Sequence, residues 1–302
     1  MPERRPNILL LGPNGQVGWE LRRALSTLGQ VRTAGLEQAD HRLDLTDEEA
    51  LRGLIARSRP DLLVNAAAWT AVDRAEEEPE AARRINAEAV RVLGEAAAAI
   101  GSPVLHYSTD YVFSGEGSRP WRETDPAEPV SVYGRTKLEG ERRLAESGAD
   151  HLILRLAWVY GGRGHNFLRT MQRLMTERER IGVVADQFGS PSWSRQIAEA
   201  TAQVLAQCRA DDGGFAFGGR GGVHHLTAAD MASWHDFATA IAEGLGSRCQ
   251  VEPIATEDYP TPARRPAWSV LDNDRLWRTF GVALPHWREG LALCLEELLG
   301  RQ

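Results

Sequence analysis

Tyr133 and Lys137 stand four residues apart in the stretch Val132–Leu138. On a helix this spacing places both side chains on one face, one turn from each other. A nearby cation favours the charged form of a phenol, whose free pKa is about 10. We therefore predict that Lys137 lowers the pKa of Tyr133. Such a phenol suits proton transfer to a carbonyl group that is receiving a hydride.

A hydroxyl residue, Thr109, follows the apolar run Pro103–Ser108, which reads as a strand. In an open parallel sheet, ligands gather beyond the carboxyl ends of the strands. We predict that Thr109 lies there and that Tyr133 arrives from the next helix, so that both hydroxyls bond the same carbonyl oxygen. Lys137 is predicted to bond the ribose of a nicotinamide as well.

Glycines at positions 12, 15 and 18 follow the apolar strand-like segment Asn7–Leu11 and open a helical pattern that runs to Leu28. Glycines at such a turn let the backbone approach a pyrophosphate, and the helix that follows directs its free N–H groups at the anion. The order strand, glycine turn, helix therefore predicts a dinucleotide site. Beyond the strand Asp61–Asn65, the small side chains Ala66, Ala67 and Ala68 leave room for the cofactor, although close helix packing explains them equally well.

The identity of the dinucleotide stays open between NADPH and NADH. NAD usually meets an acid at the end of the second strand, and NADP a basic residue. Around that point the chain offers Arg32, Glu37 and Asp40.

Short apolar runs alternate with helical patterns through the first half of the chain. Strands that alternate with helices imply right-handed crossovers and a parallel sheet covered on both faces. The predicted class is α/β, a Rossmann-like doubly wound sheet. Further predicted strands and helices are the strand His151–Ala157 and the helices Glu80–Ile100, Tyr133–Glu146, Arg195–Cys208, Asn273–Phe280 and Pro285–Leu299.

Composition excludes several classes of partner. The chain has 302 residues and a formal net charge of −7, with scattered Lys and Arg, which argues against a nucleic-acid surface. No apolar run approaches a membrane span, and no apolar signal region precedes the first strand. Cys208, Cys249 and Cys294 show no metal-ligand spacing, so we expect reduced thiols in a cytoplasmic protein.

Longer strings around these motifs resemble the extended short-chain dehydrogenase/reductase family, most closely its reductases of 4-keto nucleotide sugars. The resemblance covers essentially the whole chain. It is carried by residues 15–21, 65–76, 106–113, 132–141, 154–160, 166–167, 186–191 and 259–266.

The resemblance implies that the protein reduces the C4 ketone of dTDP-4-dehydro-β-L-rhamnose with NADPH or NADH. This is the last step in the synthesis of dTDP-L-rhamnose, which is a precursor of O-antigen. It implies a smaller C-terminal domain for the nucleotide sugar. The dinucleotide domain would span residues 1–154 with a return at roughly 183–226, and the sugar domain residues 155–182 and 227–302.

The same resemblance implies the roles of individual residues. Tyr133 would give the proton to the C4 oxygen, and Lys137 and Thr109 would assist it. The implied sugar contacts are Thr109, Asp110 and Trp158. The implied cofactor contacts are Gly12, Gly15, Gln16, Val17, Gly18, Asp44, Leu45, Ala66, Ala67, Ala68, Tyr107, Tyr133 and Lys137.

Two departures from the family pattern affect further expectations. Some members dimerise around Mg²⁺ held by glutamates; Glu20 and Glu297 match two such positions, but Arg195 stands at a third. A cation there repels Mg²⁺, so we expect no magnesium-bridged homodimer of the usual kind, although water could complete a weaker magnesium site. The oligomeric state stays open, with a homodimer as one alternative. Where the family often has Arg-Pro-x-Asn-Ser, the chain has Arg265–Ser269 with Trp268 in place of the amide, which affects contacts near the dTDP end.

Two alternative functions remain at this stage. A nucleotide-sugar dehydratase or epimerase shares the scaffold, but a dehydratase carries an Asp-Glu pair after the active-site threonine, and here Tyr111 follows Asp110. A non-catalytic, cofactor-binding regulatory subunit is the second, since similar proteins regulate methionine adenosyltransferase. Intact Thr109, Tyr133 and Lys137 argue against it, because a binding module needs no acid.

Overall fold

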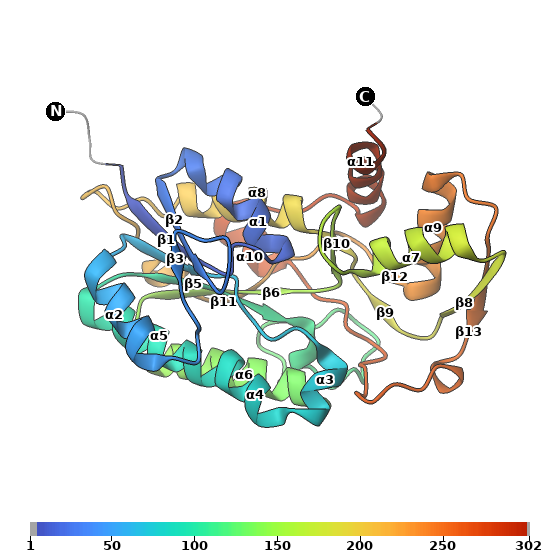
Figure 1. Ribbon diagram of the computed structural model, residues 1–302, viewed down its shortest axis with the longest axis horizontal. Coiled ribbons are helices and arrows are strands. Elements are labelled where there is room, and N and C mark those ends of the chain that lie inside the picture. The colour runs from blue at the N-terminus through green and yellow to red at the C-terminus, as the bar shows by residue number, and fades with distance from the viewer. Residues whose placement is uncertain (1–4, 301–302) are drawn as a thin grey trace.

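A seven-stranded parallel sheet forms the centre of the computed structural model, which describes residues 5–300 (Figure 1). The strand order is β11-β6-β5-β4-β1-β2-β3. This confirms the predicted Rossmann-like class. The strands are β1 (Asn7–Leu11), β2 (Gln30–Gly35), β3 (His41–Arg42), β4 (Leu62–Asn65), β5 (Val104–Thr109), β6 (His151–Leu156) and β11 (Gly222–His225).

Strand β1 is almost entirely apolar because both faces of the sheet are covered. Ile8 through Leu11 are fully buried, which explains a run of large aliphatic residues without alternation. Parallel pairing sets Leu11 of β1 beside Asn65 of β4, and Asn65 beside His106 of β5. The carboxyl ends of three strands therefore meet at one edge of the sheet.

Helices pack on both faces of the sheet, as Figure 1 shows. Helices α1 (Gln16–Ala24) and α8 (Ser194–Ala206) share one face and one apolar cluster. Helices α2 (Glu48–Ser58), α5 (Ala89–Ile100) and α6 (Val132–Glu146) cover the other face, where they lie side by side. The predicted helix Gln16–Leu28 ends its α-helical part at Ala24 and continues as a 3-10 turn, Leu25–Thr27.

The long helix predicted for Glu80–Ile100 is interrupted by a π-helical turn. It consists of α4 (Pro79–Arg83), the π turn Arg84–Glu88 and α5. Asn86 lies buried in that turn and bonds the backbone N–H and carbonyl of Trp69 and the hydroxyl of Thr136. The turn thus joins the segment after β4 to helix α6.

A smaller unit lies beside the carboxyl edge of the sheet and has its own apolar core. It contains three two-stranded ladders: β8 (Arg180–Val184) with β13 (Gln250–Ile254), β9 (Phe188–Gly189) with β12 (Ala232–Ser233), and β7 (Val159–Tyr160) with β10 (Ser192–Trp193). Its helices are α7 (Phe167–Glu177), α9 (Trp234–Leu245) and α11 (Trp287–Leu299). Within residues 5–300, no helix combines the length and apolar character needed to cross a bilayer.

The predicted division into two domains stays a prediction, and its outermost residues, 1–4 and 301–302, lie outside the described part. Helix α8 and strand β11 do return to the large sheet. The return begins later than residue 183, because β8 and β9 pair within the smaller unit. Helix α10 (Asp274–Phe280) packs in the core of the large sheet, although residue 227 onward was assigned to the sugar domain.

An acidic side chain, that of Glu76, lies at the start of helix α6. Glu76 belongs to helix α3 (Val72–Glu77), and its carboxylate accepts a hydrogen bond of 2.7 Å from the N–H of Val132. That N–H belongs to the first turn of α6, whose free donors favour an anion. Glu76 therefore helps to fix the helix that carries Tyr133 and Lys137.

Candidate active site

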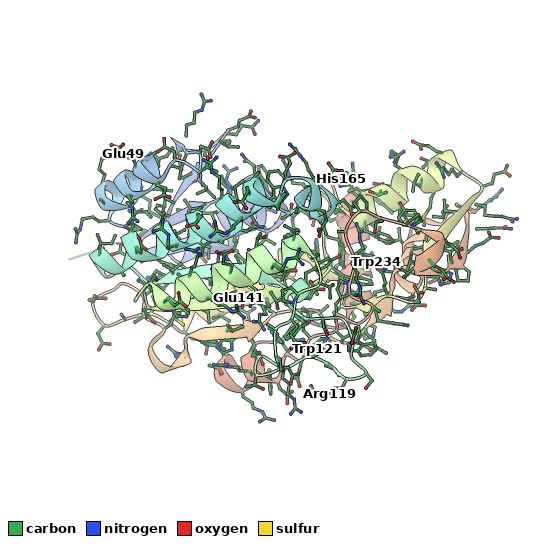
Figure 2. All side chains as sticks on the ribbon, turned by 90° about the horizontal axis from the view of Figure 1, so that it is seen from below. Glu49, Arg119, Trp121, Glu141, His165 and Trp234 are labelled. Atoms are coloured by element: carbon green, nitrogen blue, oxygen red, sulfur yellow. The ribbon has the colours of Figure 1, made fainter. Side chains whose placement is uncertain are left out.

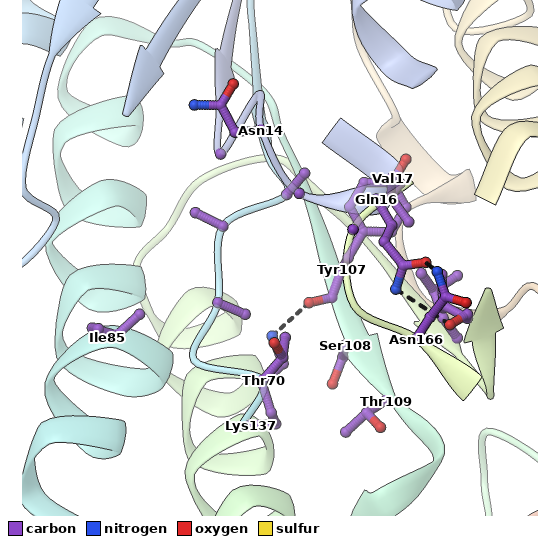
Figure 3. Close-up of a pocket in the computed structure, with 18 of the residues that line it drawn as sticks. Asn14, Gln16, Val17, Thr70, Ile85, Tyr107, Ser108, Thr109, Lys137 and Asn166 are labelled. Atoms are coloured by element: carbon purple, nitrogen blue, oxygen red, sulfur yellow. Dashed lines mark hydrogen bonds between the residues drawn. The ribbon is translucent and has the colours of Figure 1, made fainter. Parts of the chain in front are cut away.

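One cavity of about 1040 Å³ runs along the carboxyl edge of the large sheet and reaches the smaller unit. It joins the glycine turn at one end to Thr109, Tyr133 and Lys137 at the other. Figure 3 shows residues from this cavity, with Asn14 and Val17 near the turn and Thr109 and Lys137 further along. His165 and Trp234, which also line it, lie where the two units meet (Figure 2).

The glycine turn is shaped for close backbone approach. Gly12 has a φ of +74°, and a Cβ there would lie 2.7 Å from the backbone of Ala67. Gly15 is the N-cap of α1 in extended conformation. Both line the cavity, together with Val17. The first N–H groups of a helix lack partners within the helix, so this end of α1 fits a pyrophosphate.

Gly18 does not line the cavity, contrary to the prediction that it contacts the cofactor. A Cβ at this position would lie 2.0 Å from the carbonyl oxygen of Gly12. The absence of a side chain therefore lets α1 pack against the turn. Sequence spacing alone does not separate this packing role from a ligand contact.

The amide of Gln16 is held by the protein rather than left free for a phosphate. Its Oε1 accepts a bond of 2.9 Å from Asn166, and its Nε2 donates to the carbonyl of Val159 at 3.3 Å (dashed lines in Figure 3). Asn166 is also the N-cap of α7. Gln16 and Asn166 together join the glycine turn to the smaller unit.

The end of the cavity at the glycine turn is also lined by Leu36, Glu37, Asp44 and Leu45. The carboxylate of Asp44 accepts bonds from the N–H and hydroxyl of Thr46, which hold its pKa below the usual range. Of the three side chains considered for cofactor choice, Glu37 lines the cavity. Asp40 instead bonds Thr33, and Arg32 is not among the lining residues.

The chemical end brings together Thr109, Asp110 and Tyr133. Thr109 ends β5, and its hydroxyl donates to the carboxylate of Asp110 at 2.9 Å. Burial raises the pKa of Asp110 to about 6, although the nearby hydroxyls of Ser269 and Thr109 oppose the shift. Its Oδ2 atom is buried without a protein partner. This carboxyl group is therefore suited to hold a proton or to bond a ligand.

The prediction that Lys137 lowers the pKa of Tyr133 is wrong for this structure. Burial raises the pKa of Tyr133 to about 12, with a lowering contribution from the hydroxyl of Thr109. Lys137 is itself buried and donates to the carbonyl of Tyr107 at 2.6 Å, and burial lowers its pKa to about 8. Both groups line one cavity, but burial sets the pKa of each, and neither group is among the influences on the pKa of the other.

The remaining predicted cofactor contacts have clear positions. Ala66, Ala67 and Ala68 line the cavity beside the glycine turn. Tyr107 also lines it, but its hydroxyl bonds Thr201 of α8 at 2.8 Å, so the phenol serves the packing of α8.

Aromatic rings form the wall of the cavity on the side of the smaller unit. Trp158 has a φ of +45° and stacks on Trp234 with the ring centroids 3.5 Å apart and the planes 1° from parallel. Phe167 lies against Trp234 at 4.6 Å. Gly189 makes room for the indole, because a Cβ there would lie 2.4 Å from the ring of Trp158.

Arg195 lies between the two glutamates considered as magnesium ligands. It forms ion pairs with Glu20 at 3.4 Å and with Glu297 at 2.5 Å. Within residues 5–300, no group of three or more His, Cys, Asp or Glu side chains is arranged to hold a metal. The described geometry of these three residues is that of an ion-pair network.

Several cavity residues were not found from the sequence. Trp234 comes from α9, far along the chain, and no local motif marks it. Asn166 belongs to a segment that carries the family resemblance, and its position directly before a predicted helix start was the available signal. His106 contacts Lys137 but is not among the residues that line the cavity. Further residues that line the cavity, and that were not predicted as site residues, include Asn14, Thr70, Val72, Ile85, Ser108 and Phe167.

Comparison with known proteins places this geometry in a family. A family model described as "RmlD substrate binding domain" matches residues 6–299. The dTDP-4-dehydrorhamnose reductase of Burkholderia thailandensis is 48% identical over 302 residues, covering 97% of this chain and 99% of the relative. The chain belongs to the dTDP-4-dehydrorhamnose reductase family. The reductase of Escherichia coli K12 is 43% identical over 97% of this chain and 98% of its own.

Solved structures agree with this family membership. A dTDP-4-dehydrorhamnose reductase from Clostridium acetobutylicum has a TM-score of 0.89 at 35% identity, covering 97% of this chain and 99% of its own. The Bacillus anthracis reductase in complex with NADP has a TM-score of 0.88 at 30% identity over the same shares. A Thermus thermophilus UDP-glucose 4-epimerase, at 21% identity and a TM-score of 0.80, shares the fold alone.

Proposed function

We propose that the protein reduces the C4 ketone of dTDP-4-dehydro-β-L-rhamnose to dTDP-L-rhamnose with NADPH or NADH. One observation carries this proposal: a single cavity joins a dinucleotide-type glycine turn to a phenol and a hydroxyl at a strand end. The names of the relatives support the choice of sugar. The product would supply surface polysaccharides such as O-antigen, and one relative is named a spore coat polysaccharide biosynthesis protein.

The residues of the cavity divide the work between binding and proton transfer. A bound reduced nicotinamide supplies the hydride. Tyr133 donates the proton to the C4 oxygen, and Thr109 bonds that oxygen as negative charge develops. Asp110 accepts bonds from the sugar, and Trp158 lies against its ring. Lys137 bonds the nicotinamide ribose and helps to neutralise the phenolate that remains.

The burial of Tyr133 favours its role as a proton donor in the direction of ketone reduction. A phenol with a pKa of about 12 stays protonated at any pH at which the protein works. It is therefore loaded with the proton that the reaction needs, and it releases this proton only to a stronger base. The alkoxide formed when a ketone accepts a hydride is such a base.

The basic test follows reduced nicotinamide absorbance with enzymatically prepared dTDP-4-dehydro-β-L-rhamnose. We expect turnover with a product identical to dTDP-L-rhamnose by NMR. Because Glu37 lines the cavity beyond β2, where a carboxylate suits a free 2′-hydroxyl, we also expect a lower dissociation constant for NADH than for NADPH. Binding of both cofactors without turnover of any 4-keto sugar would contradict the proposed reaction.

The place of the indole of Trp158 can be tested at Gly189. In Gly189→Ala the new methyl group displaces the indole from its stack, which costs about 1 kcal/mol in side-chain geometry. We expect KM for the nucleotide sugar to rise roughly tenfold, equivalent to about 1.4 kcal/mol, with unchanged cofactor affinity. Gly219→Ala is the matched control, since a Cβ there meets nothing within 4 Å. Unchanged KM in Gly189→Ala would exclude Trp158 from the sugar site.

We propose that the protein acts in the cytoplasm on a nucleotide sugar. Reduced nicotinamide and nucleotide sugars are intracellular metabolites, and the three cysteines are free thiols. Light scattering tests the oligomeric state. Separate expression of the two parts tests the division into a dinucleotide domain and a sugar domain.

A further inference from the structure

Three buried polar side chains from three elements form a line beneath the cavity. Asn65 ends β4, His106 lies in β5 and Lys137 in α6, and their exposed fractions are 2%, 0% and 2%. Asn65 Nδ2 lies 3.0 Å from His106 Nδ1, and His106 Nε2 lies 3.3 Å from Lys137 Nζ. Buried polar groups are costly unless paired, so this line is a specific arrangement.

The direction of the hydrogen bonds in this line is fixed at one end. The backbone N–H of Ala67 donates to Asn65 Oδ1 at 3.1 Å, which orients the amide and turns Nδ2 toward the imidazole. Nδ2 is a donor, so His106 Nδ1 accepts. Burial and the charge of Lys137 keep the pKa of His106 well below its usual value, and the ring is neutral. A neutral imidazole that accepts at Nδ1 carries its proton on Nε2.

The Nε2–H group therefore points at Lys137 Nζ. An ammonium is a donor only, so the two N–H groups oppose each other while Lys137 is charged. A neutral amine offers a lone pair to Nε2–H and still donates to the carbonyl of Tyr107. The line of hydrogen bonds is complete when Lys137 is neutral and strained when it is charged.

Other charged or titratable groups around Lys137 act in both directions. On α6, Glu141 favours the ammonium, but it forms a buried bidentate pair with Arg155 at 2.9 and 2.7 Å. Tyr133 on α6, Tyr107 on β5 and Asp110 after β5 lie around the same part of the cavity. Among these groups His106 is the one in direct contact with Nζ through a ring nitrogen.

We propose that His106 is a positioning residue that presents Nε2–H to Lys137 and, through Asn65, couples the proton occupancy of Lys137 to the backbone of Ala67 beside the cofactor turn. This rests on the proposed reductase function. In this arrangement the line holds Nζ at the ribose end of the cavity and keeps its proton mobile. The imidazole touches neither sugar nor cofactor and acts through the lysine.

The tautomer of His106 is the first test, and it does not depend on activity. We would label histidine with ¹⁵N in the full-length protein and identify the His106 signal by its loss in His106→Leu. We expect a neutral ring with the proton on Nε2 at neutral pH. In Asn65→Asp the new carboxylate accepts from the ring, and the proton should move to Nδ1. A wild-type proton on Nδ1, or a charged ring, overturns the proposal.

The second test uses the pH dependence of kcat/KM for the 4-keto sugar. In Asn65→Asp, Nε2 becomes an acceptor for the ammonium of Lys137 and stabilises its charged form. The midpoint of the alkaline limb of the pH profile of kcat/KM should therefore move up by about one pH unit. A new charge also acts through space, and His106→Leu with and without Asn65→Asp separates the two effects. We expect the shift to disappear without the imidazole; a shift of equal size in both backgrounds overturns the proposal.

His106→Leu alone should lower kcat about 10- to 100-fold, because Nζ loses its contact with the imidazole and keeps its bond to the carbonyl of Tyr107. Thermal unfolding checks that the fold persists. A folded variant with wild-type kcat and pH profile contradicts the proposal. If the wild-type protein itself shows no reductase activity, the proposed function fails, and the tautomer measurement still decides the hydrogen-bond line. The two failures are therefore distinguishable.

Discussion

Tyr133→Phe is expected to lower kcat for reduction of the 4-keto sugar by about 10²- to 10⁴-fold, the usual contribution of a positioned general acid. The variant keeps the ring and loses only the hydroxyl, whose partner in the cavity is Thr109. Cofactor affinity should stay within about twofold, because most of the predicted cofactor contacts lie elsewhere in the cavity, at the glycine turn and at Ala66–Ala68. Steady-state kinetics and a cofactor titration measure the two effects.

Tyr111→Phe is the matched control for this prediction. Tyr111 is a second phenol on the same cavity, and its ring lies edge-on to that of Tyr133 with the centroids 5.5 Å apart. Burial raises its pKa as well, so both phenols are protonated acids in similar surroundings. Loss of turnover in Tyr111→Phe with normal turnover in Tyr133→Phe would assign proton donation to the other phenol.

Burial disfavours the charged forms of the titratable groups at the chemical end. Burial raises the pKa of Tyr133 and of Asp110, and it lowers the pKa of Lys137. The cavity therefore disfavours charge of either sign before a ligand enters. A low dielectric strengthens each later interaction with the developing alkoxide, at the expense of stability of the folded chain.

The central sheet could be predicted because its signals are local. Strands buried on both faces, such as β1 and β4, read as continuous apolar runs, and helices such as α6 show a helical period with a capping serine, Ser131. The two-residue strands β7, β9, β10 and β12 have no such signal. They exist because segments far apart in sequence meet in the smaller unit, and two residues carry no period.

Site residues could be predicted where their position in the chain demands a particular residue type. They were missed or misassigned where the role of the residue depends on a partner that lies far away in the sequence. Gly12 and Thr109 follow from a turn and a strand end. Gly18 was assigned to the cofactor because spacing does not reveal that the space beside it is filled by the Gly12 carbonyl. The raised pKa of Tyr133 depends on burial, which the four-residue spacing to Lys137 does not report.

Asp110→Asn is expected to stabilise the protein at neutral and alkaline pH while weakening sugar binding. The folded-state pKa of Asp110 is about 6 against an ordinary 3.8. Between these values the folded protein holds a proton that the unfolded chain has lost, so the free energy of unfolding falls as pH rises from about 4 to about 6. Above pH 6 the full penalty applies, about 3 kcal/mol for two pKa units.

Asparagine avoids this penalty and preserves the local bonds. Its Oδ1 accepts from the hydroxyl of Thr109 as the carboxylate does, and its Nδ2 lies beside the hydroxyl of Ser269. Urea unfolding of the ligand-free protein should show Asp110→Asn more stable than wild type by up to about 3 kcal/mol at pH 8. The difference should shrink toward zero as pH falls to about 4.

Asp125→Asn supplies a control of opposite sign. The pKa of Asp125 is lowered to about 2, first by Arg119, which bonds its carboxylate at 2.8 and 2.9 Å. This carboxylate stabilises the fold at neutral pH, and its contribution is lost as pH falls below the ordinary value toward 2. Asp125→Asn should therefore destabilise the protein at pH 8, where Asp110→Asn stabilises it. Destabilisation by both changes at pH 8 would mean that the cavity keeps Asp110 ionised at little expense, and its Oδ2 would then be a solvated sugar ligand rather than a buried acid.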